Sequence, residues 1–207
     1  TEGSENTEAG DAKESLETTH FSIVDVEGNA VSMTTTLNGG YGSKLVVAEA
    51  GFLLNNEMDD FSAKPGTPNM FGLIGAEANK IEPGKRMLSS MTPTIVEKDD
   101  QLLLVCGTPG GSTIITSVFQ AVSNVIDFDM TASEAVQSPR FHHQWLPDVL
   151  ILEDVGFDTT LIADLNAMGH HAKLRGKLGK VEAIKALENG DLEGAADIRA
   201  DDDVKGF

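Results

Sequence analysis

A threonine near the beginning of this chain has a position that suits acyl-transfer chemistry. Thr18 stands where an acidic stretch, TEGSENTEAGDAKESLE, gives way to the alternating sequence TTHFSIVDV. If the peptide bond before Thr18 is cut, one residue carries both a hydroxyl nucleophile and an α-amine. That amine titrates near ~7.7 and can act as the base, so no histidine is needed. The alternative interpretation is an ordinary threonine at the start of a strand.

A pair of glycines could complement such a nucleophile. The segment TPGGS, residues 108–112, lies between an apolar run and a predicted helix, where free backbone amides favour an anion. A phosphate-binding loop is disfavoured because no lysine follows the glycines. We therefore expect the amides of Gly110 and Gly111 to form an oxyanion hole. The alternative is a tight turn that binds nothing.

Other reactive side chains are weaker candidates. Cys106 ends an apolar run and is expected in the core, and no GxSxG nucleophile motif occurs. The histidine pairs 142–143 and 170–171 suggest a metal at first sight. Adjacent residues of a strand point to opposite faces, however, and no carboxylate or thiol completes a zinc-like set. We expect neither a metal nor a cofactor.

The composition limits the partners of the protein. Its 207 residues include 33 Asp and Glu against 15 Lys and Arg, a formal net charge of −18. Such a surface repels phosphate backbones, so nucleic acid is not an expected partner. The length fits one domain with a substantial core. No apolar run approaches the ~20 residues of a transmembrane helix, and a single cysteine leaves the redox compartment open.

Sequence periodicity predicts the elements that would position the candidate groups. Residues 18–36 alternate between apolar and polar side chains around a turn at residues 27–29, which predicts a hairpin with Thr18 and Thr36 at its open ends. Residues 38–90 are rich in Gly, Asn, Asp and Pro and should be largely irregular. A second hairpin, TPTIVEK and QLLLVCG, leads into the glycine segment.

Helices and short strands follow. The helix after TPGGS should bury one apolar stripe, formed by Ile115, Val118, Phe119, Val122, Val125 and Ile126. Further helices should begin at Thr131, with a capping box, and at about Thr159, ending at Gly169. The strands are expected in VLILE, HAKLR, VEAIKAL and LEGAADI, the last two joined by a hairpin turn at Asn189 and Gly190. Together these elements predict an α+β domain of stacked sheets covered by helices.

Five segments resemble the small subunit of γ-glutamyltransferases: TTHFSIVD, LLNNEMDDFSAKPG, PGKRMLSSMTPTI, GTPGGS and SPRFHHQWLPD. They occur in the family's order, and the resemblance runs from Thr18 nearly to the C-terminus. It implies the four-layer αββα sandwich of the N-terminal nucleophile hydrolases for residues 18–207. It also implies a precursor that cuts itself between Glu17 and Thr18, so that residues 1–17 are an acidic linker preceding the processing site.

The resemblance implies roles for individual residues. Thr18 would be the nucleophile, Thr36 would orient its hydroxyl, and Gly110 and Gly111 would form the oxyanion hole. The residues implied to receive the substrate's α-amino group are Asn38, Glu57 and Asp60. Those implied to bind its α-carboxylate are Ser89 and Ser90. Composition alone would interpret these substrate residues as polar turn formers. Phe71 stands where many bacterial relatives carry a lid tyrosine, so this lid would lack one hydroxyl.

The implied activity is that of a γ-glutamyltransferase or glutathione hydrolase. The γ-glutamyl group of glutathione or a related compound would be held as an ester on Thr18 and passed to water, an amino acid or a peptide. A large subunit from the same precursor would complete a heterodimer and supply the arginine that clamps the α-carboxylate. The resemblance also implies a periplasmic or secreted protein. The alternatives are a related acylase, acting on cephalosporins or poly-γ-glutamate, and an unprocessed, inactive precursor fragment.

Overall fold

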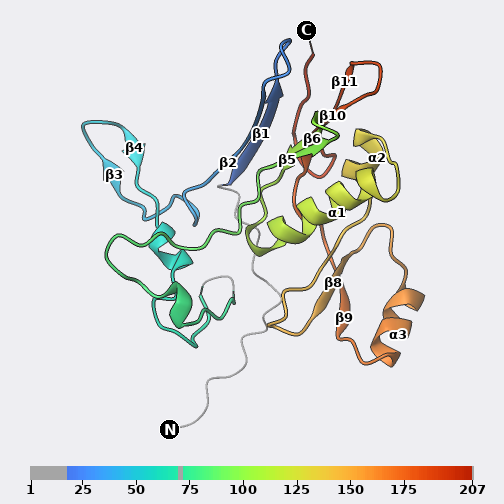
Figure 1. Cartoon of the computed structure of the whole chain (residues 1–207). Helices are drawn as coiled ribbons and strands as arrows, with labels where there is room; N and C mark the ends of the chain where they lie inside the picture. The colour runs from blue at the N-terminus through green and yellow to red at the C-terminus, as the bar shows by residue number, and fades with distance from the viewer. Residues whose placement is uncertain (1–17, 70–71, 207) are drawn as a thin grey trace.

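The computed structural model describes residues 18–69 and 72–206 (Figure 1). The predicted linker at residues 1–17 and the predicted lid residue Phe71 lie outside the described residues. The described part is an α+β structure, as predicted. None of its helices is long and apolar enough to cross a bilayer.

The first predicted hairpin is confirmed. Strands β1 (Thr19–Val24) and β2 (Ala30–Thr35) pair antiparallel, with Thr19 opposite Thr35 and Val24 opposite Ala30. Their turn is closed by Asp25, whose carboxylate accepts hydrogen bonds from the backbone amides of Glu27 and Asn29 at 2.9 and 2.8 Å. Short polar side chains of this kind stabilise turns by satisfying nearby amides.

The central sheet has four antiparallel strands in the order β11-β10-β6-β5. It is formed by β5 (Thr94–Lys98), β6 (Gln101–Gly107), β10 (Glu182–Ala186) and β11 (Leu192–Ala195). The β5–β6 and β10–β11 connections are the predicted hairpins. The first of them turns at Asp99 and Asp100, both at positive φ.

Helices cover one face of this sheet and the β1–β2 hairpin covers the other (Figure 1). Helices α1 (Ile114–Ile126) and α2 (Ala132–Gln137) share a buried core with Leu104 and Cys106 of β6. Gly107, the next residue on the opposite face of β6, lies against the ring of His20 in β1. Three layers of the predicted sandwich are therefore formed within the described residues: helices, sheet and hairpin.

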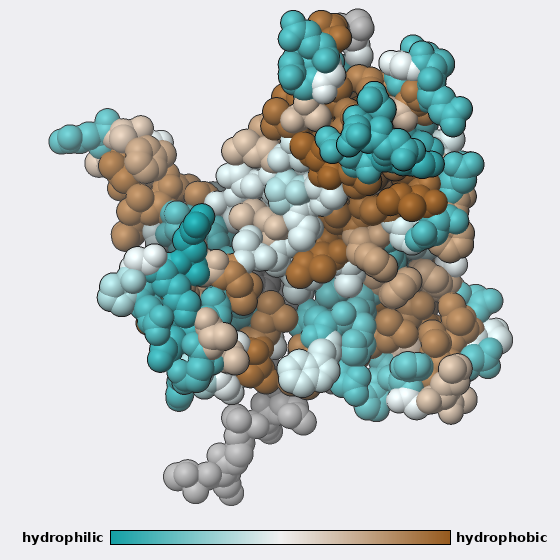
Figure 2. Space-filling view, in the orientation of Figure 1, coloured by the Kyte–Doolittle hydropathy of each residue, from teal (hydrophilic) through white to brown (hydrophobic). Residues whose placement is uncertain are grey.

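The prediction of a single buried stripe on α1 is wrong in part. Val118 and Val125 are buried, but Ile115, Phe119 and Ile126 are 52%, 68% and 52% exposed. The helix is apolar on two sides, and only one of them faces the sheet. Figure 2 shows the resulting hydrophobic surface over α1.

A smaller sheet and a third helix complete the body of the molecule. Strands β7 (Phe141–His142), β8 (Leu150–Glu153) and β9 (Ala172–Arg175) form a sheet in which β8 and β9 run parallel. Helix α3 (Thr159–Ala167) connects this parallel pair and ends before Gly169 at φ 98°, as predicted. The capping box of Thr131 and Glu134 at the start of α2 is also confirmed.

The segment 38–90 is mostly irregular, as predicted, and projects from the sheets (Figure 1). Its described residues, 38–69 and 72–90, hold only the two-residue strands β3 (Val46–Val47) and β4 (Phe52–Leu53) and two short 3₁₀ turns, η1 (Glu57–Asp60) and η2 (Glu77–Asn79). A third turn, η3 (Gly111–Thr113), leads into α1.

The hairpin has an unusual distribution of polarity. Its inward face, toward β6 and β10, carries His20, Ser22, Ser32 and Thr34 beside Val24 and Ala30. Its outward face carries four apolar side chains that are roughly half exposed: Phe21, Ile23, Val31 and Met33. Soluble sheets normally place apolar residues inward. The outward face is therefore suited to further polypeptide.

Candidate active site

The inward-facing cross-strand pairs of the hairpin are its rungs, and Thr18 and Thr36 form the last of them. They extend the β1–β2 register by one pair beyond Thr19 and Thr35. Thr18 is buried, and its Oγ1 donates a hydrogen bond to Thr36 Oγ1 at 2.9 Å. The backbone amide of Asn38 donates to the same oxygen at 2.9 Å. Thr36 Oγ1 is therefore held by two donors and fixes the position of the Thr18 hydroxyl.

Successive rungs of the hairpin face successive residues of β6. Ser22 and Ser32 form the second rung from the Thr18–Thr36 pair. The Ser32 hydroxyl donates a hydrogen bond to the carbonyl oxygen of Cys106 at 2.9 Å. The next rung carries His20, whose ring lies against Gly107. The Thr18–Thr36 rung comes next, and β6 continues into residues 108–112. This progression brings the threonine pair and the predicted glycine segment to the same end of the two layers.

The glycine segment has the backbone form that an anion site requires. Gly110 and Gly111 have φ values of 141° and 56°, which residues other than glycine rarely adopt. The Gly110 carbonyl oxygen accepts hydrogen bonds from the backbone amide and the hydroxyl of Thr113, at 3.1 and 2.8 Å. No hydrogen bond joins the amide of Gly110 or Gly111 to another described residue. Both amides are available to a ligand.

Buried hydrogen bonds hold this segment in place. Thr108 is fully buried, and its hydroxyl donates to the carbonyl of Pro109 at 2.6 Å while accepting from the amide of Lys180 at 2.7 Å. The loop is thereby tied to the segment that precedes β10. Such preorganised donors need no reorganisation when charge develops on a substrate oxygen.

Asn38 connects the threonine pair to the irregular segment. It is buried at φ 70°, and its side-chain amide donates to the carbonyl of Asn56 at 3.2 Å. The Asn56 side chain in turn accepts the amide of Gly39 at 2.8 Å. These bonds hold the start of the segment beside η1, which carries Glu57 and Asp60.

Glu57 and Asp60 form a carboxyl pair within that one turn. Burial raises the pKa of Glu57 to about 7, and the charge of Asp60 and a hydrogen bond with its side chain act in the same direction. The pKa of Asp60 is also raised, chiefly by burial. Glu57 Oε1 and Asp59 Oδ2 are buried without a hydrogen-bond partner among the described residues. A pair of this kind retains one proton near neutral pH and attracts a cation.

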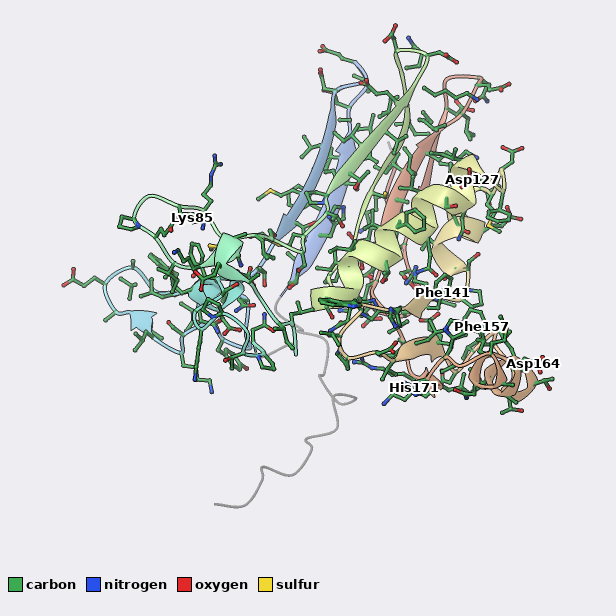
Figure 3. The ribbon with its side chains drawn as sticks, turned by 60° about the horizontal axis from the view of Figure 1, so that its bottom comes forward. Lys85, Asp127, Phe141, Phe157, Asp164 and His171 are labelled. Carbon is green, nitrogen blue, oxygen red and sulfur yellow. The ribbon has the colours of Figure 1, made fainter. Side chains whose placement is uncertain are left out.

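A pocket of about 340 Å³ extends from Asp60. Ser90 and Ser112 contribute to its lining, and Gln144 and Trp145 form part of its wall. It therefore brings together three regions that are distant in sequence: the irregular segment, the start of α1 and the loop after β7. Figure 3 shows Lys85, in the irregular segment, on the side of the molecule away from Phe141 and His171.

The structure does not bring every predicted residue to this pocket. Of the predicted residues, Asp60 and Ser90 line it, whereas the following are outside its lining: Thr18, Thr36, Asn38, Glu57, Ser89, Gly110 and Gly111. Ser89 is exposed, and its hydroxyl accepts the amide of Met91 at 3.1 Å, as a turn former would. Ser90 alone of the serine pair lines the pocket.

Sequence reasoning missed the wall formed by residues 144–146. The signal was the run HQWLP, because a proline after a bulky residue marks an irregular turn. Trp145 has φ 69° and is 75% exposed. The loop is tied to α1 through His142, whose ring bonds to Thr116 Oγ1 at 2.8 Å and to Gln144 Oε1 at 2.9 Å.

The paired histidines do not gather around a common point. His142 is buried in the bonds just described, whereas His143 contacts the exposed carboxylate of Asp148 at 3.0 Å. Across residues 18–69 and 72–206, no three His, Cys, Asp or Glu side chains are grouped as a metal site would require. Cys106 is fully buried, and burial raises the pKa of its thiol to about 12.

A helix layer, a sheet and a hairpin whose first strand is preceded by a buried threonine form the architecture of the N-terminal nucleophile hydrolases. A family model described as gamma-glutamyltranspeptidase matches residues 2–207. The chain belongs to the gamma-glutamyltranspeptidase family.

Individual relatives agree with this placement. The glutathione hydrolase proenzyme of Escherichia coli is 52% identical over 191 residues, which cover 92% of this chain and 33% of the relative. Solved structures of a mutant gamma-glutamyltranspeptidase from Helicobacter pylori and of gamma-glutamyltranspeptidase from Pseudomonas nitroreducens have TM-scores of 0.83 and 0.85 at 52% and 49% identity. They cover 88% and 91% of this chain, and 100% and 99% of the solved chains. The chain spans about a third of the length of the first curated relatives it matches.

Proposed function

We propose that this chain is the nucleophile-bearing small subunit of a glutathione hydrolase and γ-glutamyltransferase. The observation that carries the proposal is the buried hydroxyl pair of Thr18 and Thr36, at the hairpin end where the adjacent His20 lies against Gly107. Membership of the family and the name glutathione hydrolase proenzyme of its relatives support the choice of reaction.

The proposed acylation uses groups of this chain. Thr18 Oγ1 forms a bond to the γ-carbonyl carbon of the substrate, and its proton passes to the α-amine of the same residue. The amides of Gly110 and Gly111 stabilise the oxyanion, each contributing about 3 kcal/mol. Collapse of this intermediate breaks the C–N bond, and the α-ammonium returns the proton to the departing amine. The γ-glutamyl group is then an ester of Thr18.

The proposed second step releases the product. Water, or the amine of an amino acid or peptide, attacks the ester carbonyl while the Thr18 α-amine accepts the attacking group's proton. The ester C–O bond breaks, and the proton returns to the Thr18 oxygen. Protons are exchanged only among the Thr18 hydroxyl, the Thr18 α-amine and the reactants. The proposed cycle therefore needs no cofactor.

The proposed recognition of the substrate depends on charge. The carboxyls of Glu57 and Asp60, with the side chain of Asn38, would receive the α-ammonium group in charge-assisted hydrogen bonds. The unpartnered Glu57 Oε1 is one acceptor for it. Ser90 would donate to the α-carboxylate from the pocket wall, and Ser89 would need to leave its turn to join it. Phe71 would be the lid over this site.

The proposed mature form depends on cleavage and on a partner. In the uncut chain the nitrogen of Thr18 is an amide and cannot act as a base, so cleavage between Glu17 and Thr18 must precede turnover. We propose that residues 1–17 are the acidic linker preceding that bond and that 18–207 are one domain. The remaining length of the precursor would be the large subunit, covering the apolar outward face of the hairpin. Export to the periplasm or medium would follow the family resemblance, and cell fractionation tests it.

The proposal is tested with the processed heterodimer and a chromogenic γ-glutamyl anilide. Thr18→Ala should lower the rate of anilide release by a factor on the order of 10³ or more, as loss of a nucleophile does in related mechanisms. Thr19→Ala is the matched control, because Thr19 is the same residue type one position on, with its side chain exposed. Equal release by the two variants would refute the proposed nucleophile.

The substrate class has its own control. A glutaryl anilide differs from the γ-glutamyl anilide only by the missing α-amino group. The proposed carboxyl pair predicts a much higher KM for the glutaryl compound. Equal turnover of both compounds would instead favour a related acylase.

A further inference from the structure

His20 occupies the rung of the hairpin directly above the proposed nucleophile. It is buried, and its ring nitrogens contact the hydroxyls of Thr34 at 2.8 Å and Ser22 at 3.0 Å. Both partners lie on the same inward face of the hairpin. The ring is therefore fixed from within its own sheet and can act as a rigid spacer against the next layer.

Gly107 is the opposite half of this contact. A Cβ built on Gly107 would overlap three atoms of the His20 ring. Gly107 does not have the positive φ that would itself demand glycine. Its lack of a side chain is thus explained by the close approach of the ring. The pair combines the largest side chain on the hairpin's inward face with the smallest residue type on β6.

The position of this contact relates it to the chemistry. The hydroxyl of Thr18 is one rung below His20, and the amides of Gly110 and Gly111 come three and four residues after Gly107. Of the hairpin–β6 contacts described above, this one is nearest in sequence to both Thr18 and the glycine segment.

We propose that His20 is a positioning residue whose ring, seated on Gly107, sets the distance between the Thr18 hydroxyl and the Gly110–Gly111 amides. This inference rests on the proposed function. It assigns His20 no proton transfer: burial lowers the pKa of the ring to about 4, so His20 is uncharged at neutral pH. A neutral ring also adds no charge that would depress the basicity of the Thr18 amine.

The test compares size changes on the two sides of the contact in the full precursor. Gly107→Ala overfills the contact and His20→Ala empties it, so each should lower kcat on the order of 10- to 100-fold with KM within about threefold, as misplaced reacting groups do. The double variant His20→Ala/Gly107→Ala should recover much of the loss that Gly107→Ala causes. Activity is normalised to the cleaved protein, measured by intact mass.

A control separates positioning from stability. Val24 is also buried on the inward face, but two rungs farther from Thr18. Val24→Ala should lower the unfolding temperature without lowering kcat. If a variant is cleaved too slowly to be assayed as the mature form, its rate of self-cleavage replaces kcat in the same comparison.

The outcomes are distinct. Wild-type protein without γ-glutamyl transfer contradicts the proposed function itself. With an active wild type, the inference is overturned if both single variants keep kcat within about threefold, or if the double variant is no better than Gly107→Ala. It is also overturned if Val24→Ala lowers kcat as much as His20→Ala at an equal loss of unfolding temperature.

Discussion

At the scale of single residues, the carboxyl pair of Glu57 and Asp60 predicts how substrate affinity depends on pH. The pKa of Glu57 is raised to about 7, so below pH 7 the pair holds a proton and its negative charge is reduced. An ammonium group binds best when both carboxyls are ionised. KM for a γ-glutamyl anilide should therefore fall as the pH rises from about 6 to 8, while kcat rises separately because the proposed base, the Thr18 α-amine, must be deprotonated.

Glu57→Gln is the matched test of that pH dependence. The amide has nearly the same shape but does not titrate, so KM should become flat between pH 6 and 8. Initial-rate measurements at several pH values give both constants. A KM in the wild type that does not respond to pH, or a slope that survives in Glu57→Gln, would contradict the assignment.

Several site residues were predictable because strand pairing is regular. An alternating pattern that predicts a hairpin also predicts that its two ends meet, so the Thr18–Thr36 contact follows from the sequence. The pocket wall at Trp145 could not be predicted from the sequence, because it depends on how loops distant in sequence approach one another. His20 was overlooked because a histidine in a strand carries no signal until its partner across the layers, Gly107, is known.

At the scale of elements, a buried ion cluster joins the connection between α2 and β7, strand β8 and the segment after β11. Arg140 is almost fully buried and contacts Asp197 at 2.8 Å. Arg199 bridges Asp197 at 3.0 Å and Glu153 at 2.6 Å. Burial of such charged groups costs free energy, and their mutual attraction offsets that cost. Removing one partner leaves the remaining buried charges without compensation.

Arg140→Met should therefore destabilise the protein by about 3–5 kcal/mol, because it leaves a buried carboxylate with less compensation. Denaturant unfolding of the processed protein measures the change. Lys205→Ala is the control, since Lys205 forms an exposed ion pair with Asp203 at 3.2 Å and should be neutral. Indistinguishable unfolding curves for the two variants would contradict a stabilising role for the cluster.

The elements themselves were largely predictable, and their burial was not. Turn residues such as Gly28, Gly169 and Gly190 marked element ends that the structure confirms. The prediction of one buried stripe on α1 was wrong in part because the helical period indicates which residues share a side of the helix. It does not indicate whether another layer covers that side. The short strand β7 has two residues and leaves too little pattern to be detected.

At the scale of the whole molecule, the outward face of the hairpin predicts where the rest of the precursor binds. Ile23 is 52% exposed beside Phe21 in β1 and opposite Val31 in β2. Ile23→Asp would place a charge in the proposed interface, at a cost of several kcal/mol. The two pieces of the processed protein should then separate on size-exclusion chromatography.

Val26→Asp is the matched control for this experiment. It introduces the same charge on an apolar residue of the same hairpin, but in the turn, where Val26 is 86% exposed. The Val26 variant should keep its two pieces together. If both variants remain assembled, the proposed interface is elsewhere, with the exposed side of α1 as the next surface to examine.

Thr18 and Thr19 are chemically identical neighbours, yet only one of them points inward. A polypeptide trimmed one position too far would still begin with threonine and would still unite an amine with a hydroxyl. Its oxygen would be on the wrong side of the sheet, away from the glycine amides. In the proposed mechanism, the pleat of the strand, and not the identity of the amino acid, distinguishes a competent terminus from an inert one.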